Sequence, residues 1–77
     1  MDRFRIEFAE GAVETLSSHE GEELIICLKG EVELTYGPDK TVLKPGDTAY
    51  YNAVVKHGLR ALGGQPASIY GIVYMPF

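Results

Sequence analysis

This chain of 77 residues has one cysteine, no apolar run long enough to cross a membrane, and no cluster of basic residues. Cys27 has no disulfide partner within the sequence, and a lone thiol in an apolar stretch suits a reducing compartment. A membrane span needs roughly 18 apolar residues, and a signal peptide needs an apolar run behind a basic segment. Because neither pattern is present, we expect a soluble, cytoplasmic protein with no membrane partner.

Positive charge is sparse and dispersed. The chain has 7 Lys and Arg residues against 11 Asp and Glu, a net charge of −4, and the basic residues are scattered from Arg3 to Arg60. Domains that bind nucleic acid gather basic side chains into a stripe that contacts phosphates. We therefore expect no direct nucleic acid contact by this domain, and we assign the mild acidic excess to solubility.

The short chain also limits the size of the core. A single domain over 1–77 would bury only about 60% of the surface that the unfolded chain exposes, so its core is marginal unless a second subunit covers part of it. Apolar strands predicted at both ends, over 3–8 and 68–77, would leave sheet edges to cover. We therefore predict a homodimer with sheets joined or packed back to back.

Helical periodicity is absent, and the dominant period along the chain is two. Apolar residues take the even positions over 3–8 and again over 31–36, which is the pattern of half-buried strands. The isoleucine-rich run over 23–28 is typical of a buried strand. Turn residues separate the segments, and the hairpin over 28–43 is the clearest case. Seven or eight short strands predict an all-β sandwich or barrel, with strands at 3–8, 23–28, 31–36, 41–43, 48–52, 56–62 and 68–77.

A histidine and three glutamates crowd together just before the buried strand at 23–28. On one straight strand His19 and Glu23 would stand about 13 Å apart, too far for ligands that each lie about 2 Å from one metal ion. Gly21 can adopt a positive φ and turn the chain between them. His19 would then end one strand, Glu23 would open the next, and His57 would arrive from a distant strand.

Two imidazoles and one carboxylate form a ligand set with open positions, as in non-haem iron enzymes. The residues alone leave other interpretations open. The stretch around His19 could be a solvated acidic turn, and His57 could be hydrogen-bonded for stability only. In the site interpretation Glu20 and Glu22 are expected to remain in solvent.

Two motifs in the chain resemble those of the cupin superfamily. The first is G-x5-H-x-H-x3,4-E-x6-G and the second is G-x5-P-x-G-x2-H-x3-N, and the resemblance as a whole covers nearly the entire chain, from about Arg5 to Pro76. The resemblance implies a double-stranded β-helix, or jelly-roll, barrel. The first motif falls on Gly11, Ser17, His19, Glu23 and Gly30. The second keeps Gly46 and His57, while Asn52, Val54 and Ala61 stand in place of its Pro, Gly and Asn.

Cupins with the complete motif bind a divalent ion through three histidines and one glutamate. Residue by residue, the resemblance carries this role to His19, Glu23 and His57, while Ser17 stands in place of one histidine. It implies either one divalent transition metal (Zn, Fe, Mn or Ni) on three protein ligands, or a metal-free pocket in which the same residues anchor a small molecule.

The chain is also similar to the carboxy-terminal sensing domains of lambda-repressor-like helix-turn-helix regulators. The favoured function is therefore a small-molecule-binding, effector-sensing domain of a transcriptional regulator, or a relative of one. The alternative is a small metal-dependent enzyme of the dioxygenase, isomerase or decarboxylase type that uses the 2-His-1-Glu set. A third interpretation is a dimerisation module whose barrel is filled by its own side chains.

Several aromatic residues are further candidates for the pocket. Tyr50 or Tyr51 would line it or fill it, together with Tyr70 and either Tyr74 or Ile72. A slip of one residue exchanges the two faces of a strand, so the sequence leaves the choice between Tyr50 and Tyr51 open.

Overall fold

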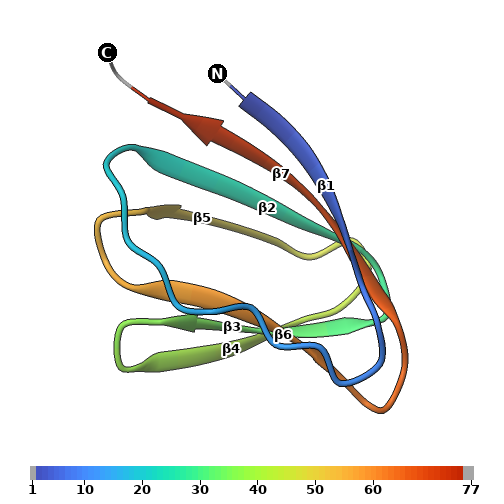
Figure 1. Cartoon of the computed structure of the whole chain (residues 1–77). Coiled ribbons are helices and arrows are strands. Elements are labelled where there is room, and N and C mark those ends of the chain that lie inside the picture. The colour runs from blue at the N-terminus through green and yellow to red at the C-terminus, as the bar shows by residue number, and fades with distance from the viewer. Residues whose placement is uncertain (1, 76–77) are drawn as a thin grey trace.

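The computed structural model describes residues 2–75, and every regular element in that range is a β-strand (Figure 1). The all-β prediction is confirmed. The predicted last strand ends at Tyr74, while Pro76 and Phe77 lie outside the described residues. The seven strands are β1 (Asp2–Phe8), β2 (Glu22–Lys29), β3 (Glu31–Tyr36), β4 (Asp39–Leu43), β5 (Thr48–Asn52), β6 (His57–Leu62) and β7 (Ala67–Tyr74).

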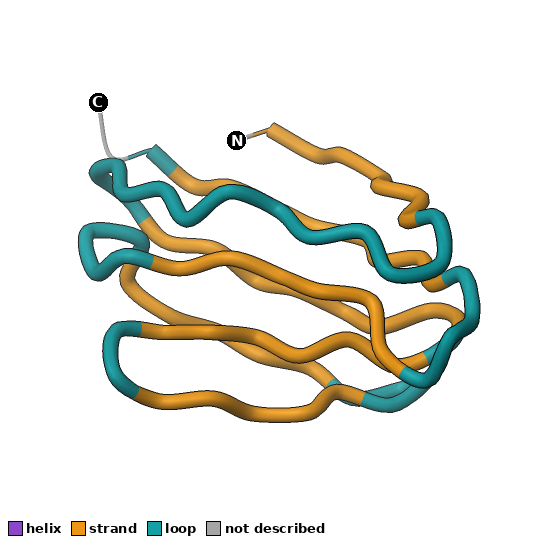
Figure 2. The backbone as a smooth tube through the Cα atoms, turned by 60° about the horizontal axis from the view of Figure 1, so that its bottom comes forward, coloured by secondary structure: helices purple, strands orange, loops and turns teal. Residues whose placement is uncertain are grey.

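The strands form two antiparallel sheets that face each other. One sheet has the order β1-β7-β2-β5 and the other the order β4-β3-β6 (Figure 1). The long segment 9–21 between β1 and β2 runs the length of the molecule (Figure 2) and extends the smaller sheet beside β6. Its attachment there consists of isolated bridges, Val13 to Arg60 and Ser17 to His57.

The core lies between the sheets, on the inward faces that the period of two predicted. Phe8 of β1 is buried, and so are Val32 and Leu34 of β3. Cys27 is a free, fully buried thiol, in keeping with its apolar setting. The described residues contain no helix long and apolar enough to span a membrane. The core cluster comprises Phe8, Ile25, Cys27, Val32, Leu34, Leu43, Leu59, Ala61, Ala67 and Ile69.

The strand register decides which tyrosine of β5 faces inward. Glu23 pairs with Tyr51 and Leu24 with Tyr50 in the ladder between β2 and β5. Because Glu23 is buried, Tyr51 shares its inward face, whereas Tyr50 is 66% exposed on the outer face. In β7, Ile69 is fully buried, so by alternation Tyr70, Ile72 and Tyr74 share the outer face with Tyr50.

Gly21 makes the turn that the sequence predicted ahead of β2. Its φ is +105°, a conformation that residues with a side chain rarely adopt, and its carbonyl accepts a 2.9 Å hydrogen bond from the Ala53 amide. A Cβ at this position would overlap the carbonyl oxygen of Tyr74. Glycine is therefore required both for the backbone angle and for the close approach of β7.

We predict that Gly21→Ala destabilises the fold by more than about 2 kcal/mol, because it combines backbone strain with a backbone clash. Gly11→Ala is the matched control, since Gly11 also has a positive φ (+74°) but no atom lies within 4 Å of the point that an added Cβ would occupy. Urea unfolding of both variants measures the difference. Equal destabilisation would show that the contact with Tyr74 is unimportant.

Candidate metal centre

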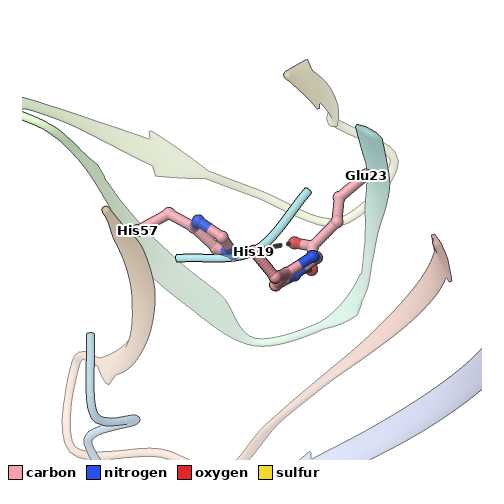
Figure 3. Close-up of side chains that lie close together, drawn as sticks. All are labelled: His19, Glu23 and His57. Carbon is pink, nitrogen blue, oxygen red and sulfur yellow. Dashed lines mark hydrogen bonds and ion pairs between the residues drawn. The ribbon is translucent and has the colours of Figure 1, made fainter. Parts of the chain in front are cut away.

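Three ionisable side chains from separate parts of the chain point toward one another (Figure 3). Glu23 is the second residue of β2, His57 opens β6, and His19 lies in the segment 9–21. One ligand atom from each lies within 4.8 Å of the other two. The turn at Gly21 returns the chain so that His19 meets Glu23. The prediction that His19 ends a strand is wrong, because its segment pairs with β6 only through isolated bridges.

The carboxylate of Glu23 lies at the centre of this cluster. It is 7% exposed, and its Oε1 lies 2.9 Å from His19 Nε2 while its Oε2 lies 3.2 Å from His57 Nε2. The Tyr51 hydroxyl donates a 2.5 Å hydrogen bond to Oε2. Burial and the Glu23 carboxylate raise the pKa of Tyr51, so the phenol keeps its proton and acts as a donor.

Both imidazole rings are oriented by backbone carbonyls. His19 Nδ1 lies 3.0 Å from the carbonyl oxygen of Glu20, and His57 Nδ1 lies 2.8 Å from that of Val55. A carbonyl oxygen can only accept, so each Nδ1 carries a proton. A neutral ring then presents the lone pair of Nε2 to the Glu23 carboxylate, which also can only accept. The arrangement is favourable only with a positive charge between them, either a proton or a metal ion.

His19 supplies part of this positive charge, because its ring binds a proton more tightly than a free imidazole does. The hydrogen bond to the Glu20 carbonyl raises the pKa of His19, burial opposes this, and the Glu23 carboxylate raises it further. A cation other than a proton would meet the same requirement.

The three residues also fit a divalent transition metal in their spacing. Ligand atoms that each lie about 2 Å from one ion are about 3 Å apart. Each oxygen of Glu23 lies at about that distance from one imidazole, 2.9 Å to His19 and 3.2 Å to His57. Metal-binding histidines usually donate their other ring N–H to a carbonyl or carboxylate, as both do here. Three protein ligands leave positions open for a ligand molecule or water.

Ser17 stands at the position of the missing motif histidine and lines a cavity next to the three-residue cluster. Its backbone is tied to His57 by two hydrogen bonds of 2.9 Å, one in each direction. A serine hydroxyl is a poor ligand for these metals beside imidazole, so the set consists of two histidines and one glutamate.

The cavity next to the cluster has a volume of about 170 Å³ and passes between the two sheets. This volume is below the roughly 300–1,000 Å³ of drug-sized ligand pockets, so it suits a molecule of only a few non-hydrogen atoms. We call its apolar lining residues the floor and its polar lining residues the wall. The floor consists of Phe4, Ile6, Ile25, Leu59 and Ile69, and the wall of Glu14, Thr15, Ser17, Glu23, Tyr51 and His57.

Glu14 is the one charged group of this wall that the sequence interpretation missed. It is half-buried, and its amide donates a 2.8 Å hydrogen bond to the carbonyl of Leu59, a core residue of β6. Burial and the Glu23 carboxylate raise the pKa of Glu14, and His57 opposes this. The sequence gives no signal for Glu14, because residues 12–15 are two apolar residues followed by two polar ones and lack the alternation of a half-buried strand.

The remaining predicted site residues lie elsewhere. Tyr50 faces outward, and its hydroxyl donates a 2.6 Å hydrogen bond to Glu22, so the structure does not bring it to the cluster. Glu20 is exposed, as expected, whereas Glu22 is half-buried by this contact.

Several solved structures resemble this chain over nearly its whole length. The Cupin_2 domain of an XRE family transcriptional regulator from Enterobacter cloacae has a TM-score of 0.90 at 24% identity, covering 99% of this chain and 82% of that one. An HTH_3 family transcriptional regulator from Vibrio cholerae has a TM-score of 0.87 at 22% identity, covering 97% of this chain and 43% of the regulator. A Cupin 2 conserved barrel domain protein from Salinispora arenicola has a TM-score of 0.87 at 18% identity, covering 96% and 62%.

These likenesses show the fold, and the sequence itself identifies the family. No curated protein sequence matches the chain. Residues 4–73, however, match the family described as a cupin domain, a range that includes both motifs and all three residues of the cluster. The resemblance seen in the motifs is confirmed, and the chain belongs to the cupin domain family.

Proposed function

We propose that this chain is a small-molecule-sensing cupin domain, either part of a transcriptional regulator or a relative of one, that holds one divalent transition metal on His19, Glu23 and His57. The observation that best supports the metal site is the pair of Nδ1-to-carbonyl hydrogen bonds, which direct both Nε2 atoms at the Glu23 carboxylate. The similarity to cupin domains of helix-turn-helix regulators supports the sensing role.

In this proposal the chain's own residues position the ion and the effector. The backbone carbonyls of Glu20 and Val55 fix the two imidazole rings, and Tyr51 fixes the Glu23 carboxylate. The metal, when bound, supplies a Lewis acid for an oxygen or nitrogen of the effector at its open positions. The same open positions also suit the alternative, a small metal-dependent enzyme of the dioxygenase, isomerase or decarboxylase type.

We expect metal-free protein to bind one Zn²⁺ per chain in calorimetric titration. His57→Ala should weaken binding by at least about 100-fold, because the loss of a mere supporting partner already costs about 10–100-fold. Ser17→His should tighten binding by about tenfold or more, since it restores an imidazole where the motif has one. Ser17→Ala is the matched control and should leave the affinity unchanged. Equal binding by wild type and His57→Ala would contradict the metal site.

The pH dependence of stability should change sign when metal binds. The raised pKa of His19 contributes stability that is complete below its ordinary value of 6.5 and is lost as the pH rises through the folded-state value. Melting temperatures of metal-free protein should therefore fall between about pH 6 and pH 8. With Zn²⁺ they should rise, because protons compete with the metal for the imidazoles.

The control for this measurement is His19→Gln, which should flatten the metal-free slope. Parallel slopes with and without Zn²⁺ would contradict the assignment of His19 as a ligand.

We also propose that the domain is a homodimer joined back to back through the outer face of the larger sheet. The adjacent strands β5, β2 and β7 form a shallow, mostly apolar groove there, lined by Leu24, Tyr50, Ile72 and Tyr74 together with one charged residue, Glu22. Tyr50 and Tyr74 are 66% and 48% exposed, which is a large apolar exposure for so short a chain. A two-fold axis over this face would bury the same patch of both copies.

Light scattering during size-exclusion chromatography should give about twice the chain mass of 8.5 kDa. Tyr50→Glu should halve that mass, because it replaces an aromatic ring of the groove by a second carboxylate beside Glu22. Val42→Glu, on the opposite sheet and 44% exposed, is the control and should stay dimeric. A wild-type mass near 8.5 kDa at micromolar concentration would refute the dimer.

A further inference from the structure

Glu14 places a second carboxylate on the wall of the cavity that Glu23 and His57 line. Its backbone is fixed by the hydrogen bond to Leu59, so the side chain is held at this wall. Among residues 2–75, the Glu14 side chain makes no hydrogen bond and no ion pair. A half-buried carboxylate without a partner in the described part of the chain is available to a ligand.

The cavity lining holds one group that offsets the charge of this carboxylate, His57, which favours the charged form of Glu14. The lining, drawn from residues 2–75, contains Glu14 and Glu23 but no Lys or Arg. The two arginines engaged in ion pairs are directed elsewhere, Arg60 to Glu33 and Arg5 to Glu7. Burial and the nearby Glu23 disfavour the charged form of Glu14, a cost that a cation in the cavity would relieve.

A metal ion on the three-residue cluster would leave Glu14 free. The group of ligand atoms that lie within 4.8 Å of one another is His19, Glu23 and His57, and Glu14 is not part of it. The Glu23 carboxylate would bind the ion, while the Glu14 carboxylate would remain at the cavity wall to face the ligand. Phe4, Ile6 and Ile25 supply an apolar floor beside it.

We infer that Glu14 is the specificity-determining residue of the pocket and selects a small ligand with a protonated amine next to a short apolar segment. The ammonium group would bind the Glu14 carboxylate, and the apolar segment would pack on the floor. The inference rests on the proposed function of this cavity as a small-molecule site and names the class of its ligand.

The test uses three probes of similar size and different charge: n-butylamine, n-butanol and butyrate. Each is titrated into the full chain, metal-free and Zn²⁺-loaded, and followed by backbone amide shifts in NMR. In the metal-free protein we expect butylamine to bind at least about tenfold more tightly than butyrate, because its ammonium group makes a charge-assisted hydrogen bond to Glu14. In the Zn²⁺-loaded protein the carboxylate of butyrate can bind the metal directly, so the comparison of the two probes is made without metal.

Two substitutions of Glu14 separate charge from structure. Glu14→Gln should lower butylamine affinity about tenfold and remove the preference over butyrate, while Glu14→Asp keeps the charge and should retain the preference. Glu31→Gln makes the same chemical change on an exposed residue of β3 and should have no effect. Circular dichroism of each variant verifies folding, and if Glu14→Gln fails to fold, the preference of the wild type for butylamine over butyrate carries the test.

The outcomes distinguish this inference from the function on which it rests. Butyrate binding the metal-free protein as tightly as butylamine would overturn the inference, and so would unchanged selectivity in Glu14→Gln, while Zn²⁺ binding would leave the metal site standing. Zn²⁺ binding without binding of any probe would also overturn the inference alone. If neither Zn²⁺ nor any probe bound, the proposed function would fail as well.

Discussion

The buried carboxylate of Glu23 is the group on which the rest of the site depends. A carboxylate is costly to bury unless charge or hydrogen bonds compensate for it, and here three groups from three parts of the chain surround it: Tyr51, His19 and His57. The protonated Tyr51 hydroxyl donates to it. The two imidazoles have already used a ring N–H on backbone carbonyls, so they require an added positive charge. The free energy that it costs to bury the Glu23 carboxylate therefore favours the binding of a proton or a metal ion between it and the two imidazoles.

Much of the fold could be predicted because the chain alternates apolar and polar residues. The faces of β1 and β3 follow from the alternation in 3–8 and 31–36, and the hairpin of β3 and β4 from its turn residues. The turn at Gly21 followed from a distance argument, since no straight strand could join His19 to Glu23. Each of these inferences depends on local geometry, which a single sequence contains.

The parts that could not be predicted depend on pairing between distant segments. Tyr50 and Tyr51 are chemically alike, and only the ladder to β2 places Tyr51 beside Glu23. Glu14 was missed for a related reason. Its segment has no ladder of its own, and its position at the cavity comes from the hydrogen bond to Leu59 of β6. The motif positions carry no information on a residue that lies between them, as Glu14 lies between Gly11 and Ser17.

The segment 9–21 supplies Glu14, Ser17 and His19, yet isolated bridges rather than a continuous ladder attach it to β6. Segments joined to a sheet through isolated bridges open at lower free energy than strands within a continuous ladder. A ligand bound by these side chains stabilises the closed form of the segment by its binding free energy. Binding of a ligand in the cavity would therefore slow amide exchange along 9–21. The ligand could thus be sensed through the order of this one segment, while the strands of the two sheets stay in place.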